Sequence, residues 1–471
     1  MNNDSGHSDN KDAFRDSIAT IDSSGKRVWM FPSMPKGKFY DKRKYLSYFY
    51  IVLFFGIPFI EINDSPLFLI NILERKFVLF GVIFWPQDFF VFGIGMITFI
   101  VFIALFTVIY GRVFCGWACP QTIFMEMLFR RIEFWIDGDA NHQKQLKLQM
   151  WNADKIIKRV SKFSLFFLLS FLIANTFLSY IIGKDELFKM ISEPLVQNRG
   201  TLISLLIFTS VFFFIYSWFR EQVCLIACPY GRMQGVLLDK DSIVVAYDYL
   251  RGEDRHKFKK NEVRLGGDCI DCGLCVKVCP TGIDIRNGTQ LECTNCTACI
   301  DACDNIMEGV GMDKGLIRYA SENGIKDKKK LTFTRRMKAY TIVLFFLIGL
   351  ETYLLVSRSD YDATIIRAKG MLYQERENDQ ISNLFSIKLM NKTKDSLPVE
   401  MKVREFPNAK FELIGKNLYT KPGGLTQGEF FVYLNKKDIK SRKSKLHIDL
   451  YSNGKQIKTA ETTFLAPAGN K

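Results

Sequence analysis

The sequence predicts a multi-domain membrane protein, and three observations lead to this fold class. Five segments are apolar and long enough to cross the hydrocarbon core of a bilayer. Between the fourth and the fifth segment, eight of the 12 cysteines occur in two closely spaced runs. After the fifth segment, short stretches alternate apolar and polar residues, which is typical of half-buried β-strands. A chain of 471 residues has room for these three parts.

The apolar segments are rich in phenylalanine, of which the chain has 42. The predicted spans are Tyr45–Ile62, Phe89–Tyr110, Phe163–Ile182, Thr201–Phe219 and Ala339–Val356. The first span is the shortest and contains Pro58. The second span follows an apolar stretch, Phe77–Phe84, and a break at Trp85-Pro86-Gln87-Asp88, so we expect that stretch to lie in the membrane interface. Asp88 is either a functional acidic group at membrane depth or a helix N-cap.

The net charge of +15 reflects membrane topology rather than binding to nucleic acid. Lysine and arginine gather on one side of the predicted spans, within 36–44, 130–131, 155–159 and 328–338. Because loops rich in these residues stay in the cytoplasm, the pattern predicts a cytoplasmic N-terminus and contact with lipid, with no nucleic-acid partner. The first 44 residues are polar and contain no apolar core of a cleavable signal peptide.

This topology predicts the order of domains along the chain. They are a cytoplasmic tail at 1–44, four spans within 45–219 with a cytoplasmic loop at 111–160, a cytoplasmic region at 220–338, the fifth span at 339–357 and a periplasmic domain at 358–471. Within the loop, Ile123–Ile136 has apolar residues at helical spacing. The cysteine runs lie on the predicted cytoplasmic side, where thiols stay reduced.

The last domain is predicted to be an immunoglobulin-like β-sandwich. Strand-like alternation occurs at Phe385–Leu389, Glu429–Leu434 and Leu446–Tyr451, with turn residues at Pro422-Gly423-Gly424 and Asn453-Gly454. The domain contains no cysteine and therefore no disulfide. Nothing in it indicates catalysis, so we expect it to contact or position a partner.

The two cysteine runs have the spacing of bacterial ligands for [4Fe–4S] clusters. The runs are Cys269, Cys272, Cys275 and Cys279, followed by a proline, and Cys293, Cys296, Cys299 and Cys303, followed by Asp304. Each reads C-x2-C-x2-C-x3-C, in which the fourth cysteine binds the other cluster. The spacing therefore predicts two [4Fe–4S] clusters within about 260–315, one on Cys269, Cys272, Cys275 and Cys303, and one on Cys279, Cys293, Cys296 and Cys299. Structural zinc normally uses paired C-x2-C motifs, and disulfides suit small secreted domains, so both fit poorly.

The other four cysteines form a second repeat, C-x3-C-P. Cys115 and Cys119 follow the second span, and Cys224 and Cys228 follow the fourth. Cysteines at i and i+4 lie on one face of a helix, so each pair is expected to present two thiolates to a soft metal ion or a redox partner. The alternative is buried apolar cysteine, which is common in membrane helices, but two equivalent copies favour function. Met125 and Met127 are further candidate ligands for copper(I), although methionine more often fills gaps in a core.

Other cofactors are not indicated. Of the four histidines, none forms a transmembrane pair that would hold a haem. The sequence contains no G-x-G-x-x-G motif or P-loop between a strand and a helix, so no nicotinamide or ATP site is predicted.

Taken together, these features resemble the CcoG/FixG (RdxA-like) family, from about Lys36 to the C-terminus. The stretches Trp85-Pro86-Gln87-Asp88-Phe89 and Cys115-Gly-Trp-Ala-Cys119-Pro120-Gln121-Thr122 are especially similar to it. The resemblance implies an accessory protein in the bacterial inner membrane that serves assembly of cbb(3)-type cytochrome c oxidase. It further implies reduction of Cu(II) to Cu(I), with oxidase subunits or copper chaperones as partners. Asp304 follows Cys303 where the family pattern has a proline, so the resemblance does not define the surroundings of that cluster.

Chemistry supports such a reaction. A cytoplasmic donor would reduce the clusters, and thiolates of Cys115, Cys119, Cys224 or Cys228 would favour the softer Cu(I) over Cu(II). These cysteines are expected either to bind copper or to cycle between dithiol and disulfide. Two other classes of function remain. One is a carrier similar to NapH or NosR that passes electrons from quinol to a periplasmic reductase, and the other is a scaffold with purely structural clusters.

Overall fold

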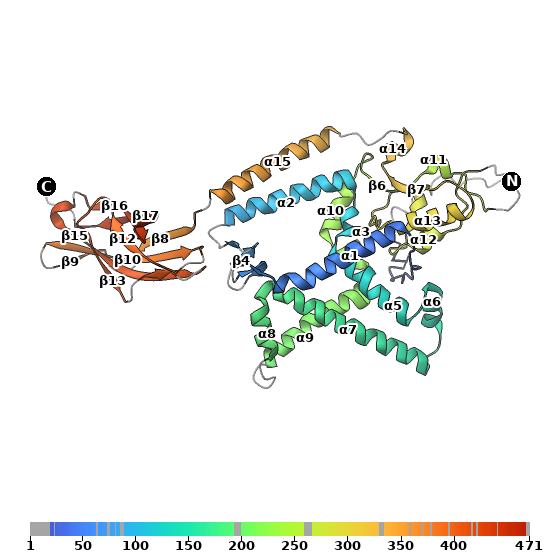
Figure 1. Cartoon of the computed structure of the whole chain (residues 1–471), viewed down its shortest axis with the longest axis horizontal. Helices are drawn as coiled ribbons and strands as arrows, with labels where there is room; N and C mark the ends of the chain where they lie inside the picture. The colour runs from blue at the N-terminus through green and yellow to red at the C-terminus, as the bar shows by residue number, and fades with distance from the viewer. Residues whose placement is uncertain are drawn as a thin grey trace. The chain divides into compact units, whose positions relative to one another are not determined.

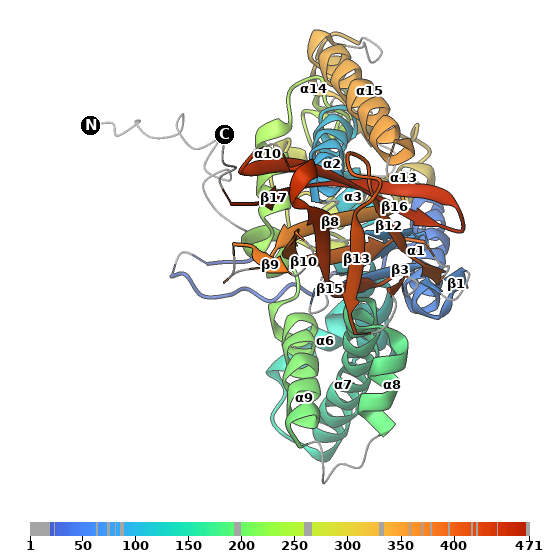
Figure 2. The same ribbon diagram turned by 90° about the vertical axis from the view of Figure 1, so that its left-hand side faces the viewer.

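The structure is a computed structural model of the full chain, and it consists of two compact units. They comprise residues 1–81 with 88–351, and residues 82–87 with 352–471 (Figures 1 and 2). The structure describes residues 19–467 apart from 23, 63–64, 73–75, 81, 85–88, 193–198, 259–265, 329–333, 358, 369, 371, 377–378, 394–395, 416–417, 421–422 and 440. The break that contains Asp88, and Pro422, lie outside the described residues.

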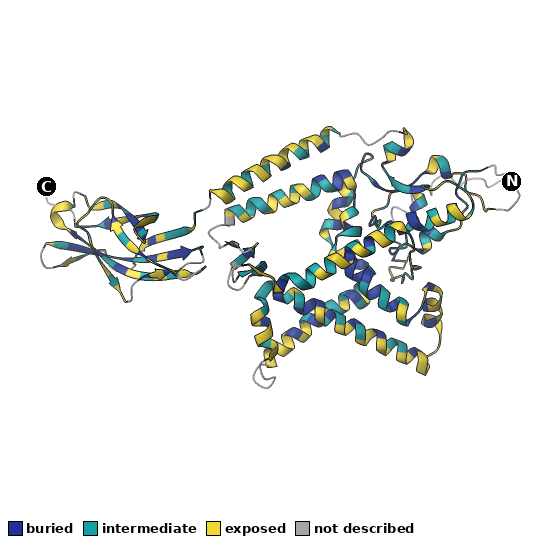
Figure 3. Cartoon of the chain, in the orientation of Figure 1, coloured by how far each residue is buried: buried dark blue, intermediate teal, exposed yellow. Residues whose placement is uncertain are grey.

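Within the described residues, four helices are long and apolar enough to cross a membrane. They are α2 (Phe89–Tyr110), α7 (Ala153–Ile182), α9 (Arg199–Phe214) with its continuation η5 (Ile215–Phe219), and α15 (Arg335–Val356). These helices contain four of the five predicted spans. Their large apolar side chains, such as Phe99, Ile207 and Phe345, are exposed, as expected for contact with lipid (Figure 3). The protein is therefore a multi-domain membrane protein.

The first predicted span is built differently. Helix α1 (Lys38–Gly56) begins among charged residues, and it is followed by a 3₁₀ turn at Ile57–Phe59 that contains Pro58. Proline cannot supply the backbone N–H of a continuing helix, which explains the end of the regular helix before Ile62. The prediction of one helix over Tyr45–Ile62 is wrong at this end. Short strands follow instead, at β1 (Glu61–Ile62), β2 (Ser65–Pro66), β3 (Phe68–Asn71), β4 (Lys76–Leu79) and β5 (Val82–Phe84).

The long helices share one end, which we call the cysteine end. Helices α2 and α15 run antiparallel, because Gly95 lies beside Glu351 while Val108 shares an apolar cluster with Met337 (Figure 1). Helix α7 packs along α9. The cysteine end is where α2 and η5 finish and where α7 and α15 begin. It carries α3 (Val113–Trp117), α4 (Pro120–Phe124), η4 (Met125–Phe129), α5 (Arg130–Ile136), α6 (Ala140–Leu148), η6 (Val223–Ala227) and α10 (Pro229–Leu237).

The cysteine-rich region packs onto this end. Its elements are β6 (Val244–Tyr247), α11 (Tyr249–Gly252), α12 (Leu274–Lys277), η7 (Ile285–Asn287), α13 (Ala298–Gly309), β7 (Ile317–Ala320) and α14 (Glu322–Lys326). The backbone N–H of Ile243 donates to the carbonyl oxygen of Ile109 at the end of α2, at 2.9 Å. The Asp301 carboxylate accepts the N–H groups of Phe39 and Tyr40 at the start of α1, at 3.1 and 2.7 Å. The orphan donors of a membrane-edge helix are thus satisfied by the cysteine-rich region.

The second unit is a β-sandwich. One sheet has the order β13-β15-β10-β8, with β9 also paired to β10, and the other has the order β12-β16-β17. The strands are β8 (Tyr361–Arg367), β9 (Gln374–Arg376), β10 (Gln380–Asn391), β11 (Leu397–Pro398), β12 (Glu400–Val403), β13 (Lys410–Ile414), β14 (Tyr419–Thr420), β15 (Leu425–Asn435), β16 (Lys443–Ser452) and β17 (Lys455–Leu465). The three predicted strand segments lie in β10, β15 and β16. Asn453 and Gly454 both have positive φ in the predicted turn, as a tight hairpin requires.

Candidate functional site

Two cavities in the cysteine-rich region are lined by cysteines, four in the first and five in the second. The first is bordered by Cys269, Cys272, Cys275 and Cys303, and the second by Cys279, Cys293, Cys296 and Cys299 and also by Cys275, which lies between the two. The fourth cysteine of each run borders the cavity that holds the first three of the other run. Apart from the shared Cys275, the structure thus brings the eight cysteines together in the two groups that their spacing predicts, and cluster binding by each group stays a prediction.

The two runs have matching backbone conformations. Asp271 and Asn295 each precede the second cysteine of a run, with φ of 50° and 53°. Gly273 and Thr297 each follow that cysteine, with φ of 67° and 66°. Left-handed φ is rare for a β-branched residue such as Thr297, which is fully buried here. The two left-handed residues on either side of the second cysteine curve each loop around its cavity. The cysteine spacing alone did not predict this backbone conformation.

Helix α13 explains how one run serves both cavities. Cys299 lies in its first turn and borders the second cavity, whereas Cys303, one turn later, borders the first. In the first run, Cys275 lies in α12, and Cys279 follows the end of that helix. The fourth cysteine of a run therefore lies one turn into α13 or just past the end of α12.

The donor set fits iron–sulfur clusters. Burial raises the pKa of Cys275 to about 11 and the pKa of Cys293 to about 12, so these thiols need a cationic ligand to ionise. Iron supplies that charge, because a coordinating thiol is deprotonated by its metal ion. The ligand spacing, with three cysteines on one loop and a fourth from the other run, suits a [4Fe–4S] cluster better than structural zinc, which normally uses paired C-x2-C motifs.

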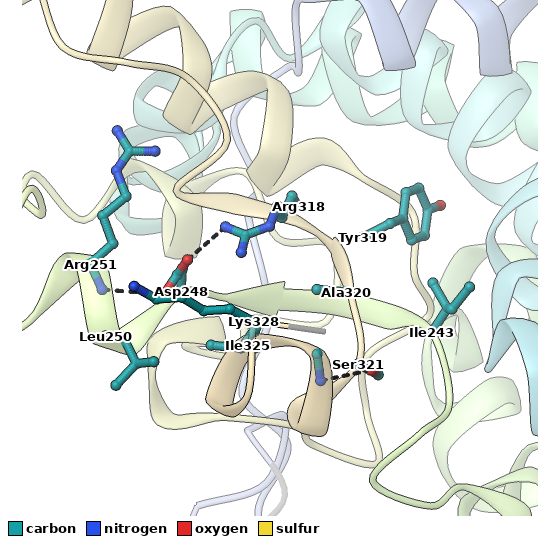
Figure 4. A pocket seen from close by; sticks show the side chains of 11 residues that line it. Ile243, Asp248, Leu250, Arg251, Arg318, Tyr319, Ala320, Ser321, Ile325 and Lys328 are labelled. Carbon is teal, nitrogen blue, oxygen red and sulfur yellow. Dashed lines mark hydrogen bonds and ion pairs between the residues drawn. The ribbon is translucent and has the colours of Figure 1, made fainter. Parts of the chain in front are cut away.

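The first cavity lies toward solvent and the second toward the membrane helices. Cys272 is the exposed cysteine among the twelve. On the paired strands β6 and β7, Tyr247 and Ile317 border the first cavity. Beyond these strands lies a separate hollow of about 800 Å³, where Arg318 points to Asp248 and donates to it at 2.7 Å (Figure 4). Arg251 and Lys328 also line this hollow and make it basic.

The two C-x3-C-P pairs have equivalent geometry. The N–H of Cys119 donates to the carbonyl oxygen of Phe114 at 2.9 Å, and the N–H of Cys228 donates to that of Val223 at 2.8 Å. Both cysteines are extended N-caps, and the proline that follows each is the first residue of α4 or α10. Proline suits that position because its missing N–H has no role there. The expectation that each pair lies on one face of a continuous helix is wrong, because the chain turns at the second cysteine.

The two pairs lie side by side at the cysteine end. The rings of Phe114 and Tyr230, neighbours of the two motifs, meet edge to face at 5.7 Å between centroids. Cys115 Sγ donates to Gln234 Oε1 on α10 at 2.9 Å. Burial raises the pKa of Cys115 to about 11 and that of Cys224 to about 12, and the neighbouring Cys119 and Cys228 thiols raise both further. All four thiols are therefore within electrostatic reach of one another.

The first pair also touches the loop of the second cavity. A side-chain Cβ at Gly116 would lie 2.5 Å from the carbonyl oxygen of Thr294 and 2.9 Å from that of Asn295. Trp117 Nε1 donates to the Tyr319 hydroxyl at 3.1 Å, and that hydroxyl donates to the Asn295 carbonyl at 3.3 Å. The buried Arg112 guanidinium donates to the Leu291 carbonyl. Sequence reasoning missed Gly116 and Arg112, because only the folded loop gives them a partner.

The second pair reaches the same loop through a small cavity. Cys224 lines this cavity together with Thr281 and Thr294, and both threonines also line the second cysteine cavity. The order from solvent to membrane is therefore the exposed Cys272, the first cavity, the second cavity and the C-x3-C-P cysteines. These sites form one contiguous path.

Replacing Gly116 with alanine is expected to separate the helix from the loop. The new methyl group meets backbone carbonyl oxygens, which cannot rotate away as a flexible side chain would. Overpacking of this kind costs about 1–3 kcal/mol. Thermal unfolding in detergent should show a lower midpoint for Gly116→Ala. Gly93→Ala in α2, where no atom lies within 4 Å of the new Cβ, should not lower the midpoint, because alanine favours a helix over glycine. Equal midpoints for both variants would contradict the close contact.

A buried ionic network supports this end of the bundle. Arg220 donates to both carboxylate oxygens of Glu133, at 2.9 and 2.8 Å, and Arg130 donates to Glu221 at 2.5 Å. Lys162 on α7 donates to Asp137 at 2.5 Å. Sequence reasoning missed this network, in which basic and acidic partners are far apart in the chain. It connects α5, α7 and the turn after η5 directly before Cys224.

The remaining predicted candidates are placed as follows. Met125 and Met127 are buried at 3% and 1% exposure, and Met125 packs in an apolar cluster with Phe129 and Tyr216. Met125 also lines the cavity that contains Cys224. A ligand role for either methionine stays a prediction.

Comparison with known protein families agrees with this architecture. A 4Fe-4S dicluster domain matches residues 219–322, and a second 4Fe-4S binding domain matches residues 92–138. Residues 352–467 match a family model described as the IG-like fold at the C-terminal of FixG. The 4Fe-4S binding domain that matches 92–138 contains two cysteines of this chain, Cys115 and Cys119.

Relatives cover most of the chain. RdxA of Cereibacter sphaeroides is 33% identical over 379 residues, which cover 78% of this chain and 80% of that protein. RdxB of the same organism is 32% identical over 397 residues, covering 80% and 82%. The nitrogen fixation protein FixG of Rhizobium meliloti is 29% identical over 438 residues, covering 83% and 82%.

Proposed function

Because the chain belongs to the FixG/RdxA family of iron–sulfur electron-transfer proteins, we propose that it reduces Cu(II) to Cu(I) in the assembly of a cbb(3)-type cytochrome c oxidase. The observation that carries this proposal is the contiguous path from the exposed Cys272 to the cysteines at the membrane edge. Each [4Fe–4S] cluster, when bound, supplies one-electron redox chemistry. The chain would hold one cluster through Cys269, Cys272, Cys275 and Cys303, and the other through Cys279, Cys293, Cys296 and Cys299.

The path has a direction. The clustering of basic residues at the cysteine end supports a topology in which that end faces the cytoplasm of a bacterial inner membrane and the β-sandwich lies in the periplasm. In this proposal, α1 is a fifth span beside the four long helices. Electrons then enter beside Cys272 from a cytoplasmic donor. The basic hollow with Arg251, Arg318 and Lys328 lies behind the strands that border the same cavity, and it suits an acidic donor surface (Figure 4).

Copper is the substrate, and it receives one electron per ion. Soft cysteine sulfur binds Cu(I) better than Cu(II), so cysteines at the end of the path favour the reduced product. The β-sandwich presents no cysteine, and its role is contact with oxidase subunits or copper chaperones. A dithiol cycle of the C-x3-C-P cysteines is the alternative way to pass electrons on.

The test is a copper titration of the full chain. We purify the protein in detergent without oxygen, reduce it, remove the reductant and add Cu(II) with a Cu(I)-specific chelator. Cluster reoxidation that matches Cu(I) formation one to one is expected. The same protein stripped of iron and alkylated at its thiols, which would otherwise reduce Cu(II) themselves, should form no Cu(I). Clusters that stay reduced in the presence of Cu(II) would overturn the cupric reductase.

A quinol-linked carrier is the second candidate, and one cavity favours it. A space of about 190 Å³ at the cysteine end is lined by Trp29, Phe163, Glu133, Asp137 and Lys162, among others. Asp137 Oδ1 is buried there without a hydrogen-bond partner. The space is smaller than the about 300–1,000 Å³ of drug-sized pockets, so it suits a single ring with a proton acceptor beside it. Reduction of the clusters by a quinol in place of a soluble donor would support this candidate.

A further inference from the structure

We propose that Cys115, Cys119, Cys224 and Cys228 together bind a third [4Fe–4S] cluster, at the membrane edge. The site is formed by the ends of two spans rather than by the two cysteine runs within 269–303. It is an alternative to the two roles proposed above for these residues, copper ligands and a dithiol relay, and it keeps the proposed reduction with the cluster as the last electron carrier before copper. The inference deepens the proposed electron path and rests on that path for the role of the cluster, although not for its binding.

The first argument is the equivalence of the two pairs. Each pair follows an apolar helix, closes the same turn with an N–H bond to the carbonyl five residues earlier, and ends on an N-cap cysteine before a proline. Two copies of one geometry therefore supply two thiols each. Four cysteine thiolates are the complete ligand set of one [4Fe–4S] cluster.

The second argument is that the copies face each other. Phe114 meets Tyr230, and Cys115 Sγ reaches Gln234 on the helix that Cys228 caps. A Cβ at Gly231, in that same helix, would lie 2.9 Å from the guanidinium of Arg112, which directly precedes the first motif. Three side chains of the first copy thus border the second copy.

The third argument is the donor set. All four cysteines are free thiols in the structure, as are the eight cysteines of the two runs within 269–303. The site therefore shares its donor type and its ligand number with the set that the spacing predicts for each of those two clusters.

The fourth argument is the setting. The buried Arg112 lies against the C-x3-C-P cysteines and donates to the Leu291 carbonyl near Cys293, so one cation faces both cysteine sets. A buried cation favours an anionic thiolate cluster over neutral thiols. In the stretch that matches a 4Fe-4S binding domain, 92–138, Cys115 and Cys119 are the cysteines available to such a cluster.

The experiment counts iron and sulfide in the full-length protein. After anaerobic reconstitution in detergent and desalting, we expect about twelve iron atoms and twelve sulfides per chain, four of each per cluster. The double variant Cys119→Ala/Cys228→Ala is expected to lose about a third of both and one of three reduced-cluster signals in electron paramagnetic resonance, while the other two remain. A wild-type content of about eight iron atoms, or of about ten with a [2Fe–2S] signal, would overturn the proposal.

Alkylation of the wild-type protein provides a measurement that does not depend on the folding of a variant. Iodoacetamide is expected to spare Cys115, Cys119, Cys224 and Cys228 in the loaded protein and to label them after iron is removed with a chelator. If the four cysteines are labelled in a protein that holds eight iron atoms, and Cu(I) alone protects them, the proposal of a third cluster is wrong and the cysteines are copper ligands. A protein with twelve irons that fails to reduce Cu(II) would keep this inference and overturn only the proposed function.

Discussion

Replacing Cys279 with alanine is expected to empty the second cavity and leave the first one loaded. Cys279 belongs to the first run in the sequence but borders the cavity of Cys293, Cys296 and Cys299. Its thiol lies beside the Thr281 hydroxyl at 3.3 Å, in a partly buried site where alanine offers no ligand. Because metal binding is coupled to the folding of such small regions, losing one ligand should also loosen the surrounding loop.

Mass spectrometry after iodoacetamide treatment can show which cavity is empty. In Cys279→Ala, the peptides that contain Cys293, Cys296 and Cys299 should become labelled, while Cys269, which borders the first cavity alone, stays protected. The matched variant is Cys303→Ala, for which the reverse pattern is expected, because Cys303 borders the first cavity. Labelling of Cys269 in Cys279→Ala would contradict the crossed grouping and would assign each run to its own cluster.

The grouping of the cysteines was predictable because it depends on local geometry. Ligands three residues apart must lie on one loop. Cys299 and Cys303 are one turn apart on α13, and this displacement along the helix carries the second side chain from one cavity to the other. Strand positions in the β-sandwich were predictable for a similar reason, since alternation of apolar residues fixes which face of β10, β15 and β16 is buried.

What the sequence could not reveal are contacts between distant segments. Gly116 looks like any small residue in a C-x3-C motif until the Thr294 carbonyl is placed against it. Tyr45–Ile62 has the composition of a span, but charged residues extend α1 toward the cysteine-rich region, where Asp301 caps it. The turn at Cys119 and Cys228 was missed because the i, i+4 rule assumes a helix that continues, whereas a proline follows each cysteine and begins a new one.

The second prediction with a large expected effect concerns Arg220. Replacing Arg220 with methionine keeps most of the volume but leaves Glu133 buried beside fewer positive charges, with its two hydrogen bonds from Arg220 lost. Both side chains are almost fully buried, at 5% and 8% exposure, so water cannot take the place of the guanidinium. Breaking a buried ion pair by removing one partner costs about 3–5 kcal/mol. We therefore expect a strongly lowered unfolding midpoint in detergent and a low yield of folded protein.

The matched control for this variant is Lys158→Met, which breaks the pair of Lys158 with Asp154 on the first turns of α7. That pair is exposed, at 39% and 58%, and its loss should cost no more than about 1 kcal/mol. The double variant Arg220→Met/Glu133→Gln removes the uncompensated charge and should recover part of the lost stability, since an apolar or neutral replacement of both partners is often tolerated. If Arg220→Met unfolds no earlier than Lys158→Met, the network does not stabilise the cysteine end. The positions of Cys224 and Cys228, which follow Arg220 directly, must then be fixed by the packing of Phe114 on Tyr230 and by the turn before Pro229.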